Sequence, residues 1–176
     1  SKGVGTSLKH FAANNQETDR LRVDARISQR ALREIYLPAF VHIVKTAQPW
    51  TIMCSYNRIN GVHSAQNHWL LTDVLRDEWG FDGIVMSDWG ADHDRVASLN
   101  AGLNLEMPPS YTDDQIVYAA RDGRIAPAQL DRMAQGMIDL INKARAAMSI
   151  DGYRFDVDAH DEVAHQAAIE SIVLLK

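Results

Sequence analysis

Apolar residues recur along this sequence with two different periods, and the alternation predicts short strands separated by longer helices. Compact apolar runs typical of buried strands lie at residues 6–11, 51–56, 83–87 and 103–107. Apolar residues at helical spacing occupy stretches between and after these runs, at residues 28–47, 67–79, 93–101 and from Pro127 onward. Because helices alternate with strands, we expect the strands to run parallel in one sheet.

Residues that start, break or line helices refine these predictions. Pro38 should kink or split the first helix, and Ile35 is expected on the buried side of that helix. Asn67 is a suitable cap for the next helix, and Asp92 for the short helix after it. Thr112 begins a Thr-x-x-Gln sequence, which is the form of a capping box.

Two α/β folds fit four successive strand–helix units: a small doubly wound sheet, or half of an eightfold (β/α)8 barrel. The glycine fingerprint of a dinucleotide site is missing, because Gly3-Val4-Gly5 precedes a strand instead of following one. From about residue 150 the sequence becomes polar and turn-rich, then helical, and finally apolar and strand-like. We therefore expect one domain at residues 1–148, a linker at 149–158, and the start of a second domain at 159–176.

Composition excludes several classes of protein. With 46% hydrophobic and 23% charged residues the chain has the composition of a globular protein, and its net charge of −5 disfavours a nucleic-acid partner. Cys54 is the single cysteine, so neither an intrachain disulfide nor a cysteine metal cluster can form, which favours the cytoplasm over an oxidising compartment. No 18-residue apolar run or signal peptide is present, and the histidines lack ligand spacing. We expect no membrane span, metal or cofactor.

Polar and aromatic residues follow the ends of all four predicted strands. In parallel α/β folds the carboxyl ends of the strands meet at one edge, where functional residues gather. Taken singly, each residue has a structural alternative: the histidine could be an ordinary hydrogen-bonding residue, and the aspartate could serve a turn. Together they predict a site for a polyhydroxylated ligand, formed by Lys9, His10, Tyr56, Asp88, Trp89 and Glu106.

Four motifs in order carry a family resemblance. KHFAANNQETDR (9–20), IMCSYNRING (52–61), LRDEWGFDGIVMSDWGA (75–91) and AGLNLEMP (101–108) resemble glycoside hydrolase family 3, in its β-glucosidase branch. The tail AHQAAIESIVLLK is similar to the start of that family's second domain. The resemblance implies a (β/α)8 TIM-type barrel followed by an α/β sandwich domain that completes the active site. This chain would hold the second half of the barrel, the linker and the first sandwich elements.

The same resemblance implies a role for individual residues. Asp88, in the motif SDW, corresponds to the catalytic nucleophile of a retaining, exo-acting β-glucosidase that removes terminal β-D-glucosyl residues. Such enzymes form a covalent glycosyl-enzyme and use a second carboxylate about 5–5.5 Å away as acid and then base. Cations nearby, Lys9 and Arg20, would help to keep the nucleophile ionised. The substrate-binding residues implied by the motifs are Lys9, His10, Arg20, Tyr56, Trp89 and Met53.

Departures from the family pattern limit this reading. The family commonly has GLDLEMP where this chain has Asn104, so a charged role at that position is in doubt. The acid/base should come from the sandwich domain beyond Lys176, and Glu106 is expected to serve packing or hydrogen bonding. A β-N-acetylglucosaminidase is disfavoured because the KHFPGHG-like loop is absent, whereas β-xylosidase and β-galactosidase specificities stay open.

A non-enzymatic alternative also stays open. Half a barrel leaves two strand edges and an apolar interior uncovered, which is unfavourable in water. We therefore expect the chain to need its missing barrel half and sandwich domain, in the same chain or in another, and it could alternatively be an inactive fragment.

Overall fold

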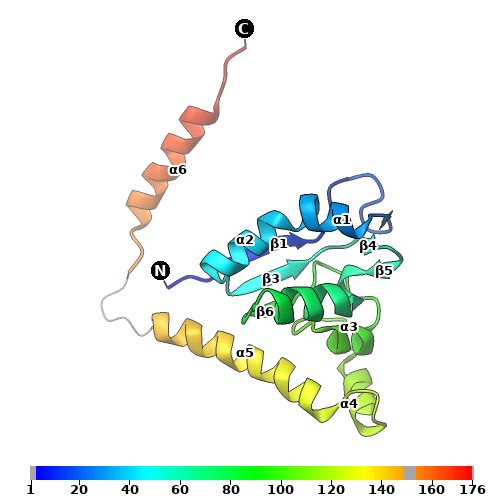
Figure 1. Cartoon of the computed structure of the whole chain (residues 1–176). Helices are drawn as coiled ribbons and strands as arrows, with labels where there is room; N and C mark the ends of the chain where they lie inside the picture. Colours follow the sequence, from blue (N-terminus) through cyan, green and yellow to red (C-terminus); the bar gives the residue numbers. More distant parts are fainter. Residues whose placement is uncertain (1–2, 149–153, 176) are drawn as a thin grey trace.

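The computed structural model describes residues 3–148 and 154–175, and its main feature is a parallel sheet (Figure 1). The sheet has the order β1 (Ser7–Phe11), β3 (Thr51–Cys54) and β6 (Ile84–Met86), all parallel. Three of the four predicted strands are thus confirmed. The fourth run, 103–107, forms an isolated parallel bridge between Leu105 and Met86 instead of a strand.

A row of apolar side chains runs across the sheet and anchors it to the helices. Leu8 pairs in register with Ile52, and Ile52 with Val85, and all three belong to or pack against the main hydrophobic core. Met53 and Met86, also paired in register, come next along the strands and so point to the opposite face, where both are partly exposed. One face of the sheet therefore holds the main core. The other, here called the open face, is partly exposed at Met53 and Met86, although Thr51 and Ile84 on it are buried.

The helix between β1 and β3 is interrupted, as predicted. It consists of α1 (Gln29–Ala31), a π-helical turn η1 (Leu32–Tyr36) and α2 (Pro38–Ala47). Pro38 occupies the first turn of α2, where its missing N–H costs nothing. The burial predicted for Ile35 is wrong, since 71% of that residue is exposed. The wider i→i+5 turn, closed by Leu37 N–H on the Leu32 carbonyl, shifts the register that a regular α-helix would keep.

The remaining helices follow the predicted order. They are the π-helical η3 (Trp69–Glu78), α3 (Arg95–Ala101), α4 (Asp113–Arg121), α5 (Pro127–Met148) and α6 (Val157–Ser171), with a short 3-10 turn η2 (Ser64–Gln66) before η3.

Helix caps agree with the sequence at one position and differ at two. Asn67 Oδ1 accepts a hydrogen bond from Leu70 N–H at 3.1 Å, as expected of a cap. Asp92 does not cap α3: Asp94 accepts from the first N–H groups of that helix, while Asp92 binds the Ser98 hydroxyl at 2.6 Å. Thr112 makes no side-chain cap bond either. At α3 the capping role that the local pattern assigned to Asp92 is thus taken by Asp94, because Asp92 binds Ser98.

A second, small sheet was not predicted. It has the order β2 (Asp24–Ala25), β4 (Arg58–Ile59) and β5 (Val62–His63), with β4 and β5 antiparallel. The connecting residues Asn60 and Gly61 have φ values of 51° and 95°, the left-handed conformations that a two-residue hairpin turn requires.

The C-terminal segment carries no buried residue. Every described residue from 154 to 175 is exposed, including the apolar run at the end, which has no strand partner. Helix α6 begins at Val157, inside the predicted linker, and residues 149–153 of that linker lie outside the described part of the chain. The boundary between two domains stays a prediction.

Asn104 links three segments of the chain beside the run predicted as the fourth strand. Its Oδ1 atom accepts hydrogen bonds from Val85 N–H at 2.9 Å and from the Arg76 guanidinium at 2.8 Å, and its amide donates to the Met133 carbonyl at 3.0 Å. The hydrogen bond from Val85 N–H in β6 thus goes to the Asn104 side chain instead of to a main-chain carbonyl. Burial, and then the positive charge of Arg132, lower the pKa of Arg76 to about 10. The neutral Asn104 joins β6, η3 and α5 without supplying a counter-charge.

We expect Asn104→Ala to destabilise the protein by about 1–3 kcal/mol, because Val85 N–H, Arg76 and the Met133 carbonyl each lose a partner away from water. Equilibrium urea denaturation measures the change. Asn142→Ala, at an exposed position of α5, is the matched control and should leave the free energy of unfolding nearly unchanged. Equal stability of the two variants would contradict this role.

Candidate active site

Asp88 lies at the centre of the polar cluster on the sheet edge. It follows β6 and is 8% exposed. Its Oδ1 atom accepts a hydrogen bond from the N–H of Trp89 at 2.8 Å, and its Oδ2 atom lies 3.4 Å from Nε2 of His10. The structure therefore brings together the ends of β1 and β6, as the parallel arrangement predicted.

Tyr56 completes this cluster from the end of β3. Burial first, and then the nearby Asp88 carboxylate with its negative charge, raise the pKa of Tyr56. The phenol therefore stays protonated beside the Asp88 carboxylate. On the other side, the Arg20 guanidinium carbon lies 5.7 Å from the centre of the Tyr56 ring, within the range of a cation–π contact.

The other predicted site residues lie around this cluster without touching Asp88 through a side-chain hydrogen bond or ion pair in the described part of the chain. Lys9 is exposed on β1, and Trp89 is 68% exposed beside the aspartate. Met53 lies on the open face of the sheet, next to Met86 on the neighbouring strand. The basic side chain that reaches Asp88 is His10, rather than the expected Lys9 or Arg20.

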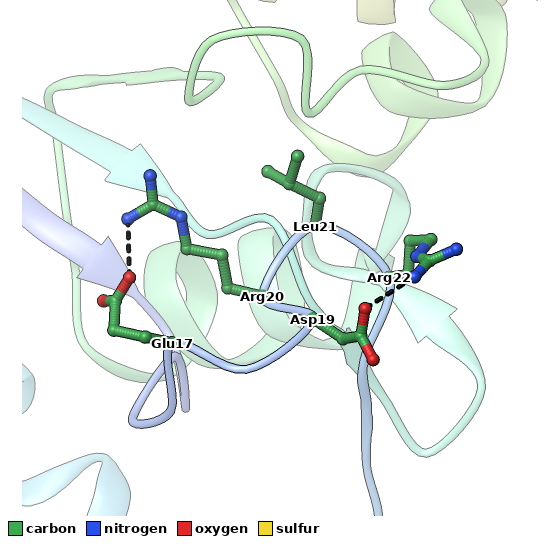
Figure 2. A pocket seen from close by; sticks show the side chains of 5 residues that line it. All are labelled: Glu17, Asp19, Arg20, Leu21 and Arg22. Atoms are coloured by element: carbon green, nitrogen blue, oxygen red, sulfur yellow. Dashed lines mark hydrogen bonds and ion pairs between the residues drawn. The ribbon is translucent and has the colours of Figure 1, made fainter.

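Arg20 belongs to the loop that follows β1. Figure 2 shows its guanidinium turned to Glu17, at 3.0 Å, and Arg22 turned to Asp19, at 2.6 Å. These residues and Leu21 line a hollow of about 390 Å³. Exposed pairs of this kind contribute little to stability, so Arg20 can exchange Glu17 for another polar partner at small cost.

The segment that carries Asp88 is tied to the segment after Leu105. The Ser87 hydroxyl accepts from Met107 N–H at 2.8 Å, and the Met107 carbonyl accepts from Gly90 N–H at 3.2 Å. Ser87 N–H donates to the Leu105 carbonyl at 2.9 Å. These three hydrogen bonds fix the loop that positions the carboxylate.

Glu106 takes part in hydrogen bonding, as expected. Its carboxylate accepts from the N–H and hydroxyl of Ser110 at 3.0 and 2.9 Å, and it lies 3.4 Å from Nε of Arg95. Arg95 also faces Asp92 at 3.7 Å, and burial raises the pKa of Asp92. The Arg95 side chain is only 13% exposed. These contacts brace the two loops next to Asp88.

The buried thiol of Cys54 is not a candidate nucleophile. Burial raises the pKa of the Cys54 thiol to about 12, so this thiol is protonated and unreactive at neutral pH.

Residues 3–148 and 154–175 contain no group of three side chains suited to a metal ion. Among the same residues, no helix combines the length and apolar character needed to cross a membrane.

Comparison with known proteins gives the family. The model of the glycosyl hydrolase family 3 N-terminal domain matches residues 1–140. The chain belongs to glycosyl hydrolase family 3. It is 93% identical over its full length to an exo-α-(1→6)-L-arabinopyranosidase of Bifidobacterium longum, of which it covers 23%.

Solved structures agree with the family and the fold. The crystal structure of Bifidobacterium adolescentis GH3 β-glucosidase aligns with a TM-score of 0.89 and 91% identity, over 99% of this chain and 26% of that one. β-Glucosidase 3B from Thermotoga neapolitana, solved in complex with α-D-glucose, aligns with a TM-score of 0.85 and 41% identity, with the same coverage. The predicted α/β barrel fragment is thereby confirmed, and the chain spans about a quarter of these relatives.

The sequence alone did not point to His63 and Arg58, which lie next to the main chain of Tyr56. His63 and Arg58 face each other across the β4–β5 hairpin, and His63 contacts both the Tyr56 main chain and the His93 ring. An available signal was the Asn60-Gly61 pair between alternating residues, which is typical of a hairpin. No local signal could reveal the pairing with β2.

Proposed function

We propose that this chain is part of a retaining, exo-acting β-glycosidase, with Asp88 as the nucleophile. The observation that carries the proposal is the environment of Asp88: a buried carboxylate with one oxygen hydrogen-bonded to a main-chain N–H, near a histidine and a tyrosine. Membership of a glycoside hydrolase family supports the same role.

The chemistry follows from these contacts. In the first step an oxygen of Asp88 bonds to the anomeric carbon while the glycosidic bond breaks, and the leaving oxygen takes a proton from a second carboxyl group. In the second step that group removes a proton from water, whose oxygen displaces Asp88. Hydrogen bonds to sugar hydroxyls lower the barrier if they strengthen in the transition state, and His10, Lys9 and Arg20 are our candidates for this role.

The second carboxyl group comes from outside this chain in our proposal. Glu106, at the end of the last strand-like segment, is occupied by Ser110 and Arg95. Because the chain covers about a quarter of its relatives, the acid/base and the rest of the sugar pocket are assigned to the missing parts. Trp89, which is 68% exposed, and Met53 on the open face are proposed to contact the sugar there.

Asp88→Asn in the whole enzyme should lower kcat by about 10³-fold or more, because the amide cannot form the glycosyl-enzyme. A 2-deoxy-2-fluoro-β-glucoside should label the unmodified enzyme, and peptide mass mapping should place the label on Asp88. Asp82→Asn, at an exposed position in the turn before β6, is the control and should retain activity. A label on another residue would refute the assignment.

Sugar specificity is proposed from stereochemistry shared by the relatives. An α-L-arabinopyranoside has the ring configuration of a β-D-galactopyranoside without its hydroxymethyl group, and both have an equatorial glycosidic bond, as does a β-D-glucopyranoside. We propose β-D-glucosides as the first substrate class. An α-L-arabinopyranosidase is the second candidate, favoured by the 93% identity to the B. longum relative.

A panel of aryl glycosides compared by kcat/KM separates these candidates. We expect turnover of β-D-glucopyranoside, weaker turnover of β-D-xylopyranoside or β-D-galactopyranoside, and little of the N-acetyl-β-D-glucosaminide. A preference for α-L-arabinopyranoside over β-D-glucoside would replace the first proposal by the second. Turnover of an α-D-glucopyranoside alone would contradict both.

The 176-residue chain by itself should not hydrolyse any of these glycosides, because an open sheet face and a missing acid/base leave the site incomplete. Size-exclusion chromatography and an aryl-glucoside assay of the isolated chain measure this. A stable, active monomer would show that the chain carries the complete machinery.

A further inference from the structure

The imidazole of His63 lies between the Arg58 side chain and the main chain of Tyr56. The Arg58 Nε–H donates to His63 Nε2 at 3.0 Å, and His63 Nδ1 lies 3.4 Å from the Tyr56 carbonyl oxygen. An arginine Nε–H can only donate, so Nε2 of His63 must carry a lone pair. The ring proton then sits on Nδ1, where it points to the Tyr56 carbonyl.

The hairpin fixes the position of this imidazole. Arg58 and His63 are paired in register across β4 and β5, so neither can move far from the other. The turn at Gly61 is held by a hydrogen bond from its N–H to Asp24 Oδ1 at 2.8 Å. The hairpin therefore holds the main chain of Arg58 beside His63, where the Arg58 Nε–H favours one tautomer of the ring.

The same ring touches the loop of Asp88. The rings of His63 and His93 lie 4.0 Å apart between centres, with a tilt of 41° between their planes. His93 is five residues after Asp88 and directly before the cap of α3. His63 thus contacts both the segment that carries Tyr56 and the segment that carries Asp88.

We infer that His63 is a positioning residue for the reaction, held as the neutral Nδ1–H tautomer by Arg58, and that it aims Tyr56 at Asp88. The activity part of this inference rests on the proposed function, whereas the tautomer does not. His63 does not contact the sugar. It acts through the main chain of Tyr56, whose side chain lies beside the Asp88 carboxylate.

The electrostatic surroundings keep the ring neutral. Burial, the neighbouring His93 and the positive charge of Arg58 lower the pKa of His63, against the opposing effects of the Tyr56 carbonyl and Asp24. A histidine with a lowered pKa stays neutral as the pH falls through about 6.5, where a free histidine becomes protonated. Only below its own lowered pKa does Nε2 gain a proton and lose the bond from Arg58.

Isosteric variants of the whole enzyme test the activity part. The amide nitrogen of asparagine can take the place of Nδ1, whereas that of glutamine reaches toward the place of Nε2. His63→Gln should lower kcat about tenfold to 100-fold with little change in KM, since the nucleophile is misaligned by a fraction of an ångström. His63→Asn should keep most of the activity, and His68→Gln, on an exposed histidine, all of it.

The tautomer is tested without any substrate. In protein labelled with ¹⁵N-histidine, the His63 signal, assigned by its loss in His63→Asn, should show a protonated Nδ1 and a bare Nε2. Arg58→Met should shift it toward the Nε2–H form that a free histidine side chain prefers. A dominant Nε2–H form in the unmodified protein, or equal loss of kcat in the Asn and Gln variants at unchanged thermal stability, would overturn the inference. If the protein hydrolyses no glycoside, the proposed function fails, and the tautomer result still decides whether Arg58 controls His63.

Discussion

The parallel pairing of β1, β3 and β6 is the constraint on which the rest of the structure depends. Because Leu8, Ile52 and Val85 share one row of the core, the carboxyl ends of the three strands lie at one edge. His10 and Asp88, 78 positions apart in the sequence, come within 3.4 Å at that edge. A slip of one residue in either strand pair would turn the apolar row to the open face and separate the polar cluster.

Much of this arrangement could be predicted from local chemistry. The apolar runs gave three strands, Pro38 gave the break in the first helix, and Asn67 gave a cap, since each depends on residues close in sequence. The convergence of polar groups followed from strand direction alone. The family motifs then pointed to the residues for which roles are proposed.

What could not be predicted depends on contacts between distant segments. The run predicted as the fourth strand forms a single bridge, and beside it the Asn104 side chain accepts the hydrogen bond from Val85 N–H. Asp92 turned to Ser98 and Arg95, which left the cap of α3 to Asp94. The sheet containing β2 requires residues 24–25 to meet residues 58–59, and no periodicity in either segment signals that pairing.

The hydrogen bond from Trp89 N–H to Oδ1 has a consequence for the symmetry of the Asp88 side chain. A free carboxylate has two equivalent oxygens that exchange by rotation about the Cβ–Cγ bond. Here one oxygen is bound to the rigid main chain of the next residue, and the other faces His10. The two oxygens are inequivalent before any ligand arrives. A reagent approaching from the open face of the sheet therefore meets a carboxylate whose orientation is already chosen.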